Sequence, residues 1–514
     1  MAPPRVRSYR WILHPFLAGL YFVLTLAAAN SGALHGWRDL VLPVAISLSF
    51  CALCWIVAFA LARDAQKAAF ISLLWVVAFS VFGYVAEALR TGDLLRRAGG
   101  EPALCLLFGL AVIGPSLAIR RTGRGLERLN HYLTLVAVIL VIYTSTQVYR
   151  GMDDNPKVVA SLSLPSRSSD PRGANERPDI YLLVLDKYTS GEVLADHFAF
   201  DNSGFETFLR SRGFVVPRHP RANYPRTQLA LASMLNLDYI HNLPEQQLLN
   251  DPIEHNRLAA FLKREGYRFV FFPSSFKFAS KNRYADLQLP PPREVIGEFR
   301  ASWERTTLLP ELVRGGCALL GCRPARFRLL PESADLMDWK FERMTELAGG
   351  PQPTFVLAHL VLPHEPFLYN ADCTHRDPYW PANAGMLRDE EANQGYLAQI
   401  SCLNFKVAAL VDSILARSRR PPVILLQSDH GHGRLGPLPD LKYVDAYRLK
   451  ERMAAFTAYL LPGLEPSRIS DSITPVNAMR FVLGHYFGAD LPLVEDASYW
   501  SSENEPLDFT RIQW

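Results

Sequence analysis

Long apolar runs dominate the first 150 residues of the chain. Each run approaches the roughly 20 apolar residues that a helix needs to cross a bilayer. The runs are Trp11–Ala29, Leu40–Ala62, Ala68–Leu89, Pro102–Ile119 and Tyr132–Val148. Because short charged loops separate them, this pattern predicts a transmembrane domain of five spans over residues 1–150 and disfavours a set of buried helices in a soluble core.

The pattern changes completely after residue 150. Residues 151–177 are polar, rich in Pro and Ser and without periodicity, which is typical of a linker. In residues 178–514, short apolar runs alternate with helical segments. The expected strands are Asp179–Leu185, Arg268–Phe272, Thr354–Leu360, Val423–Gln427 and Phe456–Leu461. The expected helices are Gly204–Arg212, Thr227–Asn236, Asn256–Glu265, Glu391–Arg417 and Pro475–Tyr486. Continuous apolar strands between amphipathic helices predict an α/β domain with a mainly parallel central sheet covered on both faces.

The charge divides at the same point. Residues 1–150 carry a net charge of +8 and the remaining residues a net charge of −4. The basic residues punctuate apolar segments and form no patch, which excludes a nucleic-acid partner. If the N-terminus is cytoplasmic, the inner segments hold nine Lys and Arg and the outer loops hold four. Because cytoplasmic loops are enriched in positive charge, we expect this orientation, with residues 178–514 outside the cytoplasm.

Four of the seven cysteines lie in the soluble part, an even number that suits disulfides in an oxidising compartment. We expect Cys317 to pair with Cys322, and Cys373 with Cys402, although the spacing leaves other pairings open. The second pair would tie a loop to a helix.

Acidic and imidazole side chains follow three of the expected strands. In parallel α/β folds, ligands gather beyond the carboxyl ends of the strands. The residues at these ends are Asp186, His359, His364, Asp429, His430 and His432. Two carboxylates and a neutral imidazole can converge on one divalent cation, which we expect to be zinc or manganese, with magnesium as a further candidate. We expect His359 to have a structural hydrogen-bonded role, because it alternates with core positions of its strand.

Thr227 is the candidate nucleophile. It begins an expected helix after Pro225 and Arg226, and a helix N-terminus offers free N–H groups to a phosphate or sulfate. A metal-bound threonine hydroxyl loses its proton more readily and becomes a usable nucleophile. The alternative is that Thr227 is only the N-cap of this helix.

Together these residues resemble the alkaline phosphatase and sulfatase superfamily over roughly residues 178–490, in particular its membrane-anchored transferases. Those include lipoteichoic acid synthase and the lipid A phosphoethanolamine transferases, which also have five spans and an extracytoplasmic catalytic domain. The resemblance implies that Asp186, Thr227, Asp429 and His430 bind the metal and that Thr227 is the nucleophile. Lys187 follows Asp186 where sulfatases have paired acids, and the element of a second zinc site is missing, so both departures point to one metal ion.

The resemblance also implies roles for residues around this centre. His364 matches the histidine that contacts the transferred phosphate and could protonate a leaving group. The candidates for binding substrate are His432, Lys277, Arg283 and Arg226. The implied location is the inner membrane of a bacterium, with the catalytic domain in the periplasm.

The resulting hypothesis is a transferase that moves a phospholipid-derived phosphate head group, of the phosphoglycerol or phosphoethanolamine type, to a glycan or lipid acceptor. It would act through a covalent phospho-threonine. One alternative is a hydrolase of phosphate or sulfate esters that uses the same site. Another is a non-catalytic membrane protein that binds a glycan or a partner enzyme.

Overall fold

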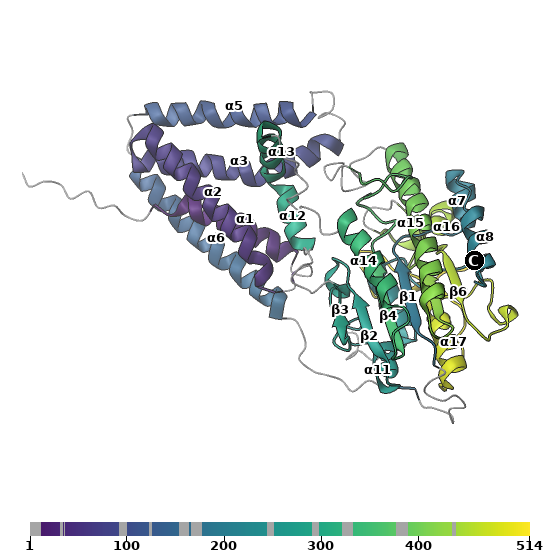
Figure 1. Cartoon of the computed structure of the whole chain (residues 1–514). Helices are drawn as coiled ribbons and strands as arrows, with labels where there is room; N and C mark the ends of the chain where they lie inside the picture. The colour runs from purple at the N-terminus through teal and green to yellow at the C-terminus, as the bar shows by residue number, and fades with distance from the viewer. Residues whose placement is uncertain are drawn as a thin grey trace, which may run out of the picture. The chain divides into compact units, whose positions relative to one another are not determined.

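The computed structural model describes residues 12–30, 34, 36–91, 100–122, 126–153, 164–165, 177–243, 251–289, 298–320, 333–376, 389–433 and 438–514. The chain divides into two compact units, each composed of two segments (Figure 1). The first unit comprises Met1–Asn155 and Ile296–Pro331, and the second comprises Pro156–Val295 and Glu332–Trp514. The expected linker, 151–177, lies mostly outside the described residues.

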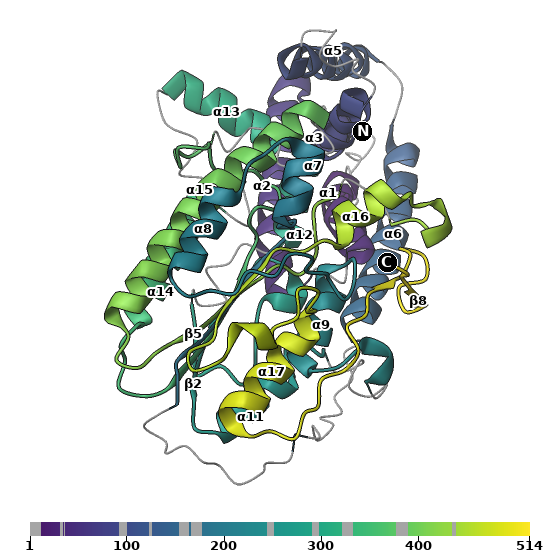
Figure 2. The ribbon, with the colours of Figure 1, turned by 90° about the vertical axis from the view of Figure 1, so that its right-hand side faces the viewer.

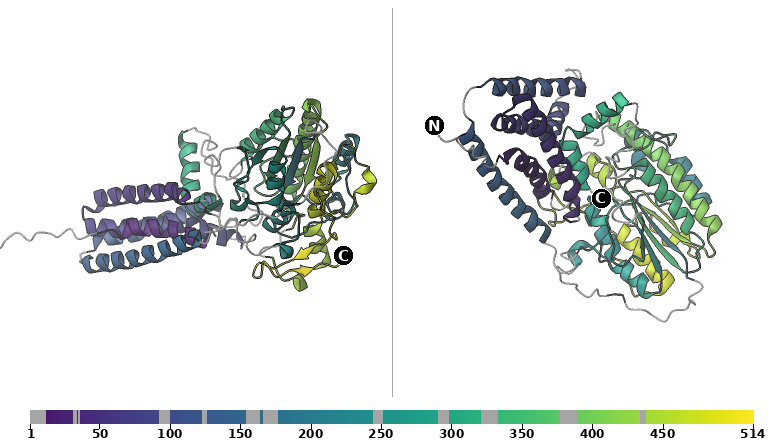
Figure 3. Two further views of the ribbon diagram at one scale, coloured as in Figure 1. Left: turned by 90° about the horizontal axis from the view of Figure 1, so that it is seen from below. Right: turned by 60° about the vertical axis from the view of Figure 1, so that its left-hand side comes forward.

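Five apolar helices form most of the first unit, as predicted. They are α1 (His14–Ala29), α2 (Arg38–Ala62), α3 (Ala65–Thr91), α5 (Gly100–Arg121) and α6 (Glu127–Asp153). Figure 3 shows these purple to blue helices beside one another. By length and composition, α2, α3, α5 and α6 can each cross a membrane, and α1 is a shorter apolar helix of 16 residues.

Two helices from the middle of the chain also belong to the first unit. These are α12 (Glu298–Thr306) and α13 (Leu309–Leu320). Phe299 and Trp303 of α12 are buried in one cluster with Val23 and Val148, and the Leu308 N–H donates to the Phe79 carbonyl at 2.9 Å. These two helices therefore group with the five apolar helices and not with the rest of residues 178–514, which the sequence pattern placed in one domain.

A six-stranded sheet forms the centre of the second unit, in the order β3-β2-β4-β1-β5-β6. Its strands are β1 (Ile180–Leu185), β2 (Arg268–Phe272), β3 (Leu287–Gln288), β4 (Thr354–Leu360), β5 (Val423–Gln427) and β6 (Thr457–Leu460). All the pairings are parallel except that between β5 and β6. The mainly parallel sheet is thus confirmed, with an antiparallel strand at one edge. A two-stranded ribbon, β7 (Tyr499–Trp500) and β8 (Thr510–Arg511), lies near the C-terminus.

Helices cover both faces of the sheet, because every residue of β1 is buried and alternate residues enter different cores. Ile180, Leu182 and Val184 pack with the helices of one face, and Tyr181, Leu183 and Leu185 with those of the other. The first face carries α9 (Thr227–Asn236), α11 (Arg257–Arg264) and α17 (Pro475–Phe487) (Figure 2). The second carries α8 (Ser203–Ser211), α14 (Ala334–Leu347) and α15 (Asp389–Arg417). The shorter helices are α7 (Gly191–Phe198), α16 (Ala446–Met453), η3 (Ile240–Asn242), η4 (Lys277–Ala279), η8 (Leu441–Tyr443) and η9 (Pro466–Arg468).

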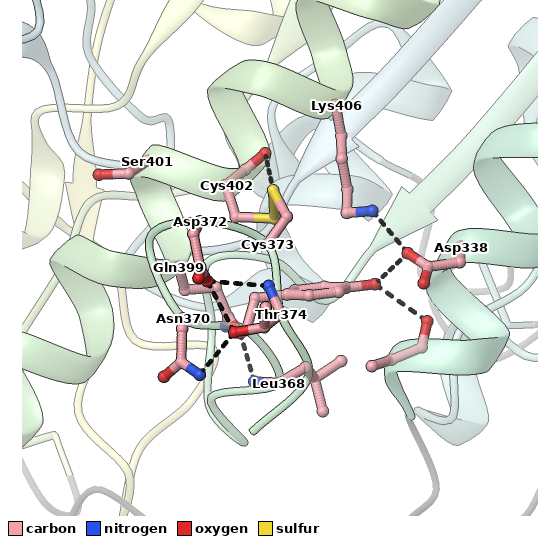
Figure 4. Close-up of a disulfide and its surroundings, with 12 residues drawn as sticks. Asp338, Leu368, Asn370, Asp372, Cys373, Thr374, Gln399, Ser401, Cys402 and Lys406 are labelled. Atoms are coloured by element: carbon pink, nitrogen blue, oxygen red, sulfur yellow. Dashed lines mark hydrogen bonds and ion pairs between the residues drawn. A yellow bond between two sulfur atoms is a disulfide. The ribbon is translucent and has the colours of Figure 1, made fainter. Parts of the chain in front are cut away.

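The long helix α15 belongs to the second unit. It is long and apolar enough to cross a membrane, but one of its faces is buried in the core of the second unit. A disulfide joins Cys402 of α15 to Cys373 in the loop after β4, with 4.9 Å between the Cα atoms (Figure 4). This is the expected tie between a loop and a helix. The expected partner pair, Cys317 and Cys322, lies outside the described side chains.

Candidate active site

Three neighbouring central strands assemble the site. Because β4, β1 and β5 are parallel, their carboxyl ends meet at one edge of the sheet. Asp186 follows β1, and Asp429 and His430 follow β5. One ligand atom from each of these three residues lies within 4.8 Å of the other two, and each side chain is at most 2% exposed. The tertiary structure therefore brings together the three non-threonine residues that the sequence assigned to metal binding.

Three of the four carboxylate oxygens of this cluster have no hydrogen-bond partner among the described residues. Among the described residues, both carboxylate oxygens of Asp186 and Oδ2 of Asp429 are buried without a hydrogen bond. Oδ1 of Asp429 accepts a hydrogen bond from the Lys187 N–H at 3.1 Å. Because buried charge without a partner is costly, these atoms require a positive counterpart. Two carboxylates and one imidazole nitrogen form a donor set that fits a divalent metal ion, with zinc and manganese both suited.

The electrostatics of the cluster agree with this fit. Burial and the charge of Asp186 raise the pKa of Asp429 to about 6. Burial also acts to raise the pKa of Asp186, but the neighbouring His364, His359 and His430 hold it below its usual range. Burial and the charge of Arg452 lower the pKa of His430, so its imidazole is neutral and can act as a ligand.

His430 points its second nitrogen into the cluster. Its Nδ1–H donates to the Gly431 carbonyl oxygen at 2.9 Å, which leaves Nε2 as the acceptor. Nε2 lies 3.3 Å from Asp429 Oδ2 and 3.9 Å from Asp186 Oδ1. This backbone contact therefore sets both the tautomer and the ring orientation that metal binding requires.

Thr227 reaches the same cluster from α9. It is the first residue of the helix, and the preceding Arg226 has the extended backbone of an N-cap, with φ −124° and ψ 135°. The Thr227 side chain does not cap its own helix. Instead, its Oγ1 lies 3.1 Å from His430 Nε2, a contact across 203 positions of sequence. The alternative that Thr227 is an N-cap is therefore wrong, and the half-buried hydroxyl lies at the candidate metal centre.

The two histidines associated with β4 flank Asp186. The Nδ1 atom of His359 lies 2.8 Å from Ser274 Oγ, which gives His359 the expected structural hydrogen bond. Its Nε2 lies 3.4 Å from Asp186 Oδ2, so His359 also belongs to the surroundings of the cluster. The His364 N–H donates to the Asp186 carbonyl oxygen at 3.2 Å, and the His364 side chain is half-buried. Both strand-end histidines thus lie beside the first acidic residue.

The four expected substrate ligands occupy different settings. The Nδ1 atom of His432 bonds to Glu451 Oε1, and its buried ring packs against Phe198 and Tyr396. The Arg226 guanidinium donates to the Ser502 carbonyl at 2.6 Å and pairs with Glu503 at 3.1 Å. Both side chains therefore have protein partners.

The other two expected ligands lie in the segment after β2. Lys277 is half-buried in η4, and Arg283 is exposed in the following loop. Phe276, which precedes Lys277, packs against the rings of His359 and His364. Lys277 thus follows a residue at the site, and the substrate roles of Lys277 and Arg283 stay predictions.

A partly buried ion pair lies beside the site, and the sequence did not predict it. Lys187 Nζ lies 2.8 Å from Glu365 Oε2, and the Tyr396 hydroxyl donates to the Lys187 carbonyl at 2.9 Å. Burial acts to raise the pKa of Glu365, but His364 and Lys187 hold it below its usual range. In the sequence, Lys187 directly follows Asp186 and Glu365 directly follows His364. These oppositely charged neighbours of two site residues were the sequence feature that could have predicted the pair. The pair links the loops after β1 and β4.

The chain is similar to solved structures, whereas comparisons by sequence find no relative. No family model matches the chain, and no curated protein sequence matches it. The C-terminal periplasmic domain of EcEptC from Escherichia coli is 12% identical with a TM-score of 0.45, and the match covers 68% of this chain and 96% of that one. Lipooligosaccharide phosphoethanolamine transferase A from Neisseria meningitidis, an integral membrane protein, is 12% identical with a TM-score of 0.42, over 92% of this chain and 94% of that one. A protein in the alkaline phosphatase superfamily from Vibrio parahaemolyticus is 14% identical with a TM-score of 0.39, over 68% of this chain and 79% of that one.

Proposed function

We propose that this chain is a metal-dependent phosphotransferase that uses Thr227 as its nucleophile. It would move a phospholipid-derived phosphate head group, of the phosphoglycerol or phosphoethanolamine type, to a glycan or lipid acceptor. The observation that supports the proposal is the approach of Thr227 Oγ1 to a buried cluster in which three of the four carboxylate oxygens have no hydrogen bond from the described residues. A half-buried hydroxyl beside unneutralised buried carboxylates has little structural use, but it suits nucleophilic catalysis.

Asp186, Asp429, His430 and the Thr227 hydroxyl would hold one divalent ion, zinc or manganese. When bound, such an ion lowers the pKa of the hydroxyl and neutralises charge on the phosphoryl oxygens. The first turn of α9 adds backbone N–H groups and the positive end of a helix dipole beside Thr227. An anionic phosphoryl group would thus meet positive potential from two sources.

The side chains support a displacement in two steps. Thr227 loses its proton to solvent, its Oγ forms a bond to phosphorus, and the bond from phosphorus to the lipid oxygen breaks. His364, half-buried beside Asp186, would give that leaving oxygen a proton. In the second step the acceptor hydroxyl attacks phosphorus and returns a proton to His364, the bond to Thr227 breaks, and Thr227 Oγ takes a proton from solvent. Both steps use the same acid–base group in opposite directions.

The first unit supports a lipid donor and a membrane location. Four helices that can cross a membrane would confine the site to a bilayer surface, where lipid head groups are concentrated. The Cys373–Cys402 disulfide favours an oxidising compartment. We infer a cytoplasmic N-terminus, an inner-membrane location and a catalytic unit in the periplasm.

Thr227→Ala provides the direct test. The full-length protein in phospholipid vesicles, supplied with zinc, is assayed for release of diacylglycerol and for head-group transfer. We expect Thr227→Ala to lose at least about a thousandfold in turnover, because the nucleophile is removed. The exposed neighbour Gln228, changed to Ala, is the matched control and should keep its activity. Undiminished turnover in Thr227→Ala would contradict the proposal.

The products separate the transferase from the alternatives. Head-group phosphate found on an added acceptor indicates a transferase, and release only to water indicates a hydrolase. Mass spectrometry of trapped protein should find the head-group phosphate on Thr227. A chain without bound divalent metal, and without turnover in any of these assays, would be the non-catalytic binding protein.

A further inference from the structure

A second arginine lies at the site, contributed by a helix that the motifs did not include. Arg452 is in the last turn of α16, and its carbonyl oxygen accepts a hydrogen bond from the Gly431 N–H at 2.7 Å. A Cβ on Gly431 would lie 2.2 Å from the Glu451 carbonyl oxygen and 2.7 Å from that of Ala454. Only glycine allows this approach. The end of α16 is therefore locked against the loop that carries Asp429 and His430.

The Arg452 side chain runs from this loop toward the nucleophile. Its Cδ would lie 3.2 Å from a Cβ on Gly433, and its Nε–H donates to the Pro225 carbonyl at 2.8 Å. Pro225 stands two residues before Thr227. The guanidinium is thus held at one nitrogen by the segment that leads into α9.

The two remaining nitrogens of the guanidinium, Nη1 and Nη2, are available to a ligand. In the part of the chain that the structure describes, neither Nη1 nor Nη2 of Arg452 has a hydrogen-bond partner, and the residue is only half-buried. Burial lowers the pKa of Arg452, and the nearby charges of Asp429, Asp186 and Glu365 act to raise it. Arg226, by contrast, donates from Nη2 to the Ser502 carbonyl and pairs with Glu503, and its Nε is buried without a hydrogen bond among the described residues. Arg452 offers both of its Nη atoms to a ligand while its Nε is held by Pro225.

Charge balance gives this arginine a use. Two aspartates neutralise a divalent ion, so the metal centre alone would leave the negative charge of a phosphodiester uncompensated. A guanidinium offers a fixed fork of N–H donors that matches phosphate oxygens. Donors placed in advance where charge develops stabilise the transition state of phosphoryl transfer.

We propose that Arg452 binds a non-bridging oxygen of the phosphoryl group that Thr227 attacks, through its Nη atoms and with Nε held by Pro225. This inference rests on the proposed function and adds a binding residue to it. Arg452 thereby joins Arg226 as an arginine proposed to contact substrate.

The experiment uses the full-length protein in detergent with zinc. Two probes are measured, inorganic phosphate for binding by calorimetry and bis(p-nitrophenyl) phosphate for turnover. We expect Arg452→Gln to weaken phosphate binding at least about tenfold and to lower kcat/KM about a hundredfold, as loss of an oxyanion donor does. Zinc content and Tm should stay at the wild-type values. Arg452→Lys should have a phosphate affinity and a kcat/KM between those of the wild type and Arg452→Gln, because lysine keeps the positive charge but lacks the forked pair of N–H donors.

The matched control is Arg448→Gln, one turn earlier on α16, where the exposed side chain pairs with Asp445 across 3.6 Å. It should behave as wild type. Phosphate affinity unchanged in Arg452→Gln, or lost in parallel with zinc, would overturn the inference. If Arg452→Gln does not fold, Arg452→Lys decides, and wild-type phosphate affinity in that variant overturns it. Turnover that survives Thr227→Ala would instead contradict the proposed function, so the two failures are distinguishable.

Discussion

Two carboxylate sites in the second unit differ in how many hydrogen bonds they receive from the surrounding side chains. Asp338 of α14, near the disulfide, accepts a hydrogen bond from Lys406 Nζ at 2.6 Å (Figure 4). It also accepts one from Tyr369 Oη at 2.8 Å, and His375 Nε2 lies 2.8 Å away. Burial acts to raise its pKa, and these partners lower it below the usual value. In the cluster of Asp186, Asp429 and His430, three carboxylate oxygens have no hydrogen bond from the described residues, and the pKa of Asp429 rises to about 6.

The difference separates structure from function. The protein completes the hydrogen bonding of Asp338 with its own side chains, so this carboxylate stabilises the fold. The cluster is more deeply buried and still incomplete, which a native fold tolerates only where something else binds. Four experiments test this difference between the two sites.

The largest effect should follow from Asp429→Asn. Because the neutral amide is a poor metal ligand, we expect bound zinc and turnover to be lost. In metal-free protein the same change should raise the unfolding temperature, since it removes one of two neighbouring buried charges. Metal analysis and thermal unfolding measure these effects. The exposed Asp412, changed to Asn, should alter neither. Full zinc occupancy in Asp429→Asn would rule out this cluster as the metal centre.

Loss of the disulfide should cost stability and leave the chemistry intact. Cys373 and Cys402 are 29 residues apart, and a cross-link over such a loop contributes about 3 kcal/mol. We expect Cys402→Ser to lower the free energy of unfolding in urea by that amount. Zinc content and turnover should be unchanged at temperatures below unfolding. A loss of zinc in this variant would mean that the two regions are coupled.

Acid should weaken metal binding through Asp429. A proton must leave this carboxyl before it can bind a cation, so zinc affinity should fall about tenfold per pH unit below pH 6 and level off above it. In metal-free protein the sign is opposite. The folded pKa of Asp429 lies above the unfolded value of about 3.9, so stability is lost as pH rises from about 4 to 6. Competition with a chelator across pH measures the affinity, and a flat profile between pH 5 and 6 would contradict this assignment.

The smallest effect should come from Lys406→Met. The Lys406–Asp338 ion pair is partly exposed, and Asp338 keeps Tyr369 and His375 as partners. We therefore expect a loss of about 1 kcal/mol in the free energy of unfolding, with zinc content and activity unchanged. Urea unfolding measures it, and Lys442→Met, at an exposed pair with Asp440, is the control.

Local pattern was sufficient for much of the fold. Strands β2, β4 and β5 and helix α9 have the predicted bounds, because continuous apolar runs and helix starts are properties of neighbouring residues. Asp186 and Asp429 could be found because strand ends in a parallel sheet share one edge. The short helix α7 and helices α12, α14 and α16 carried weaker signals and were missed.

The amino-acid pattern was enough to give the order of apolar helices and buried strands, the acidic and imidazole groups at the strand ends, and the candidate nucleophile. The partners of these groups became known from the folded chain alone. Thr227 meets His430 across 203 positions, Arg452 reaches the loop before α9, and α12 packs on the N-terminal apolar helices. The physical reason is that periodicity records burial along one element, whereas hydrogen bonds, charge compensation and packing are settled between elements that fold together.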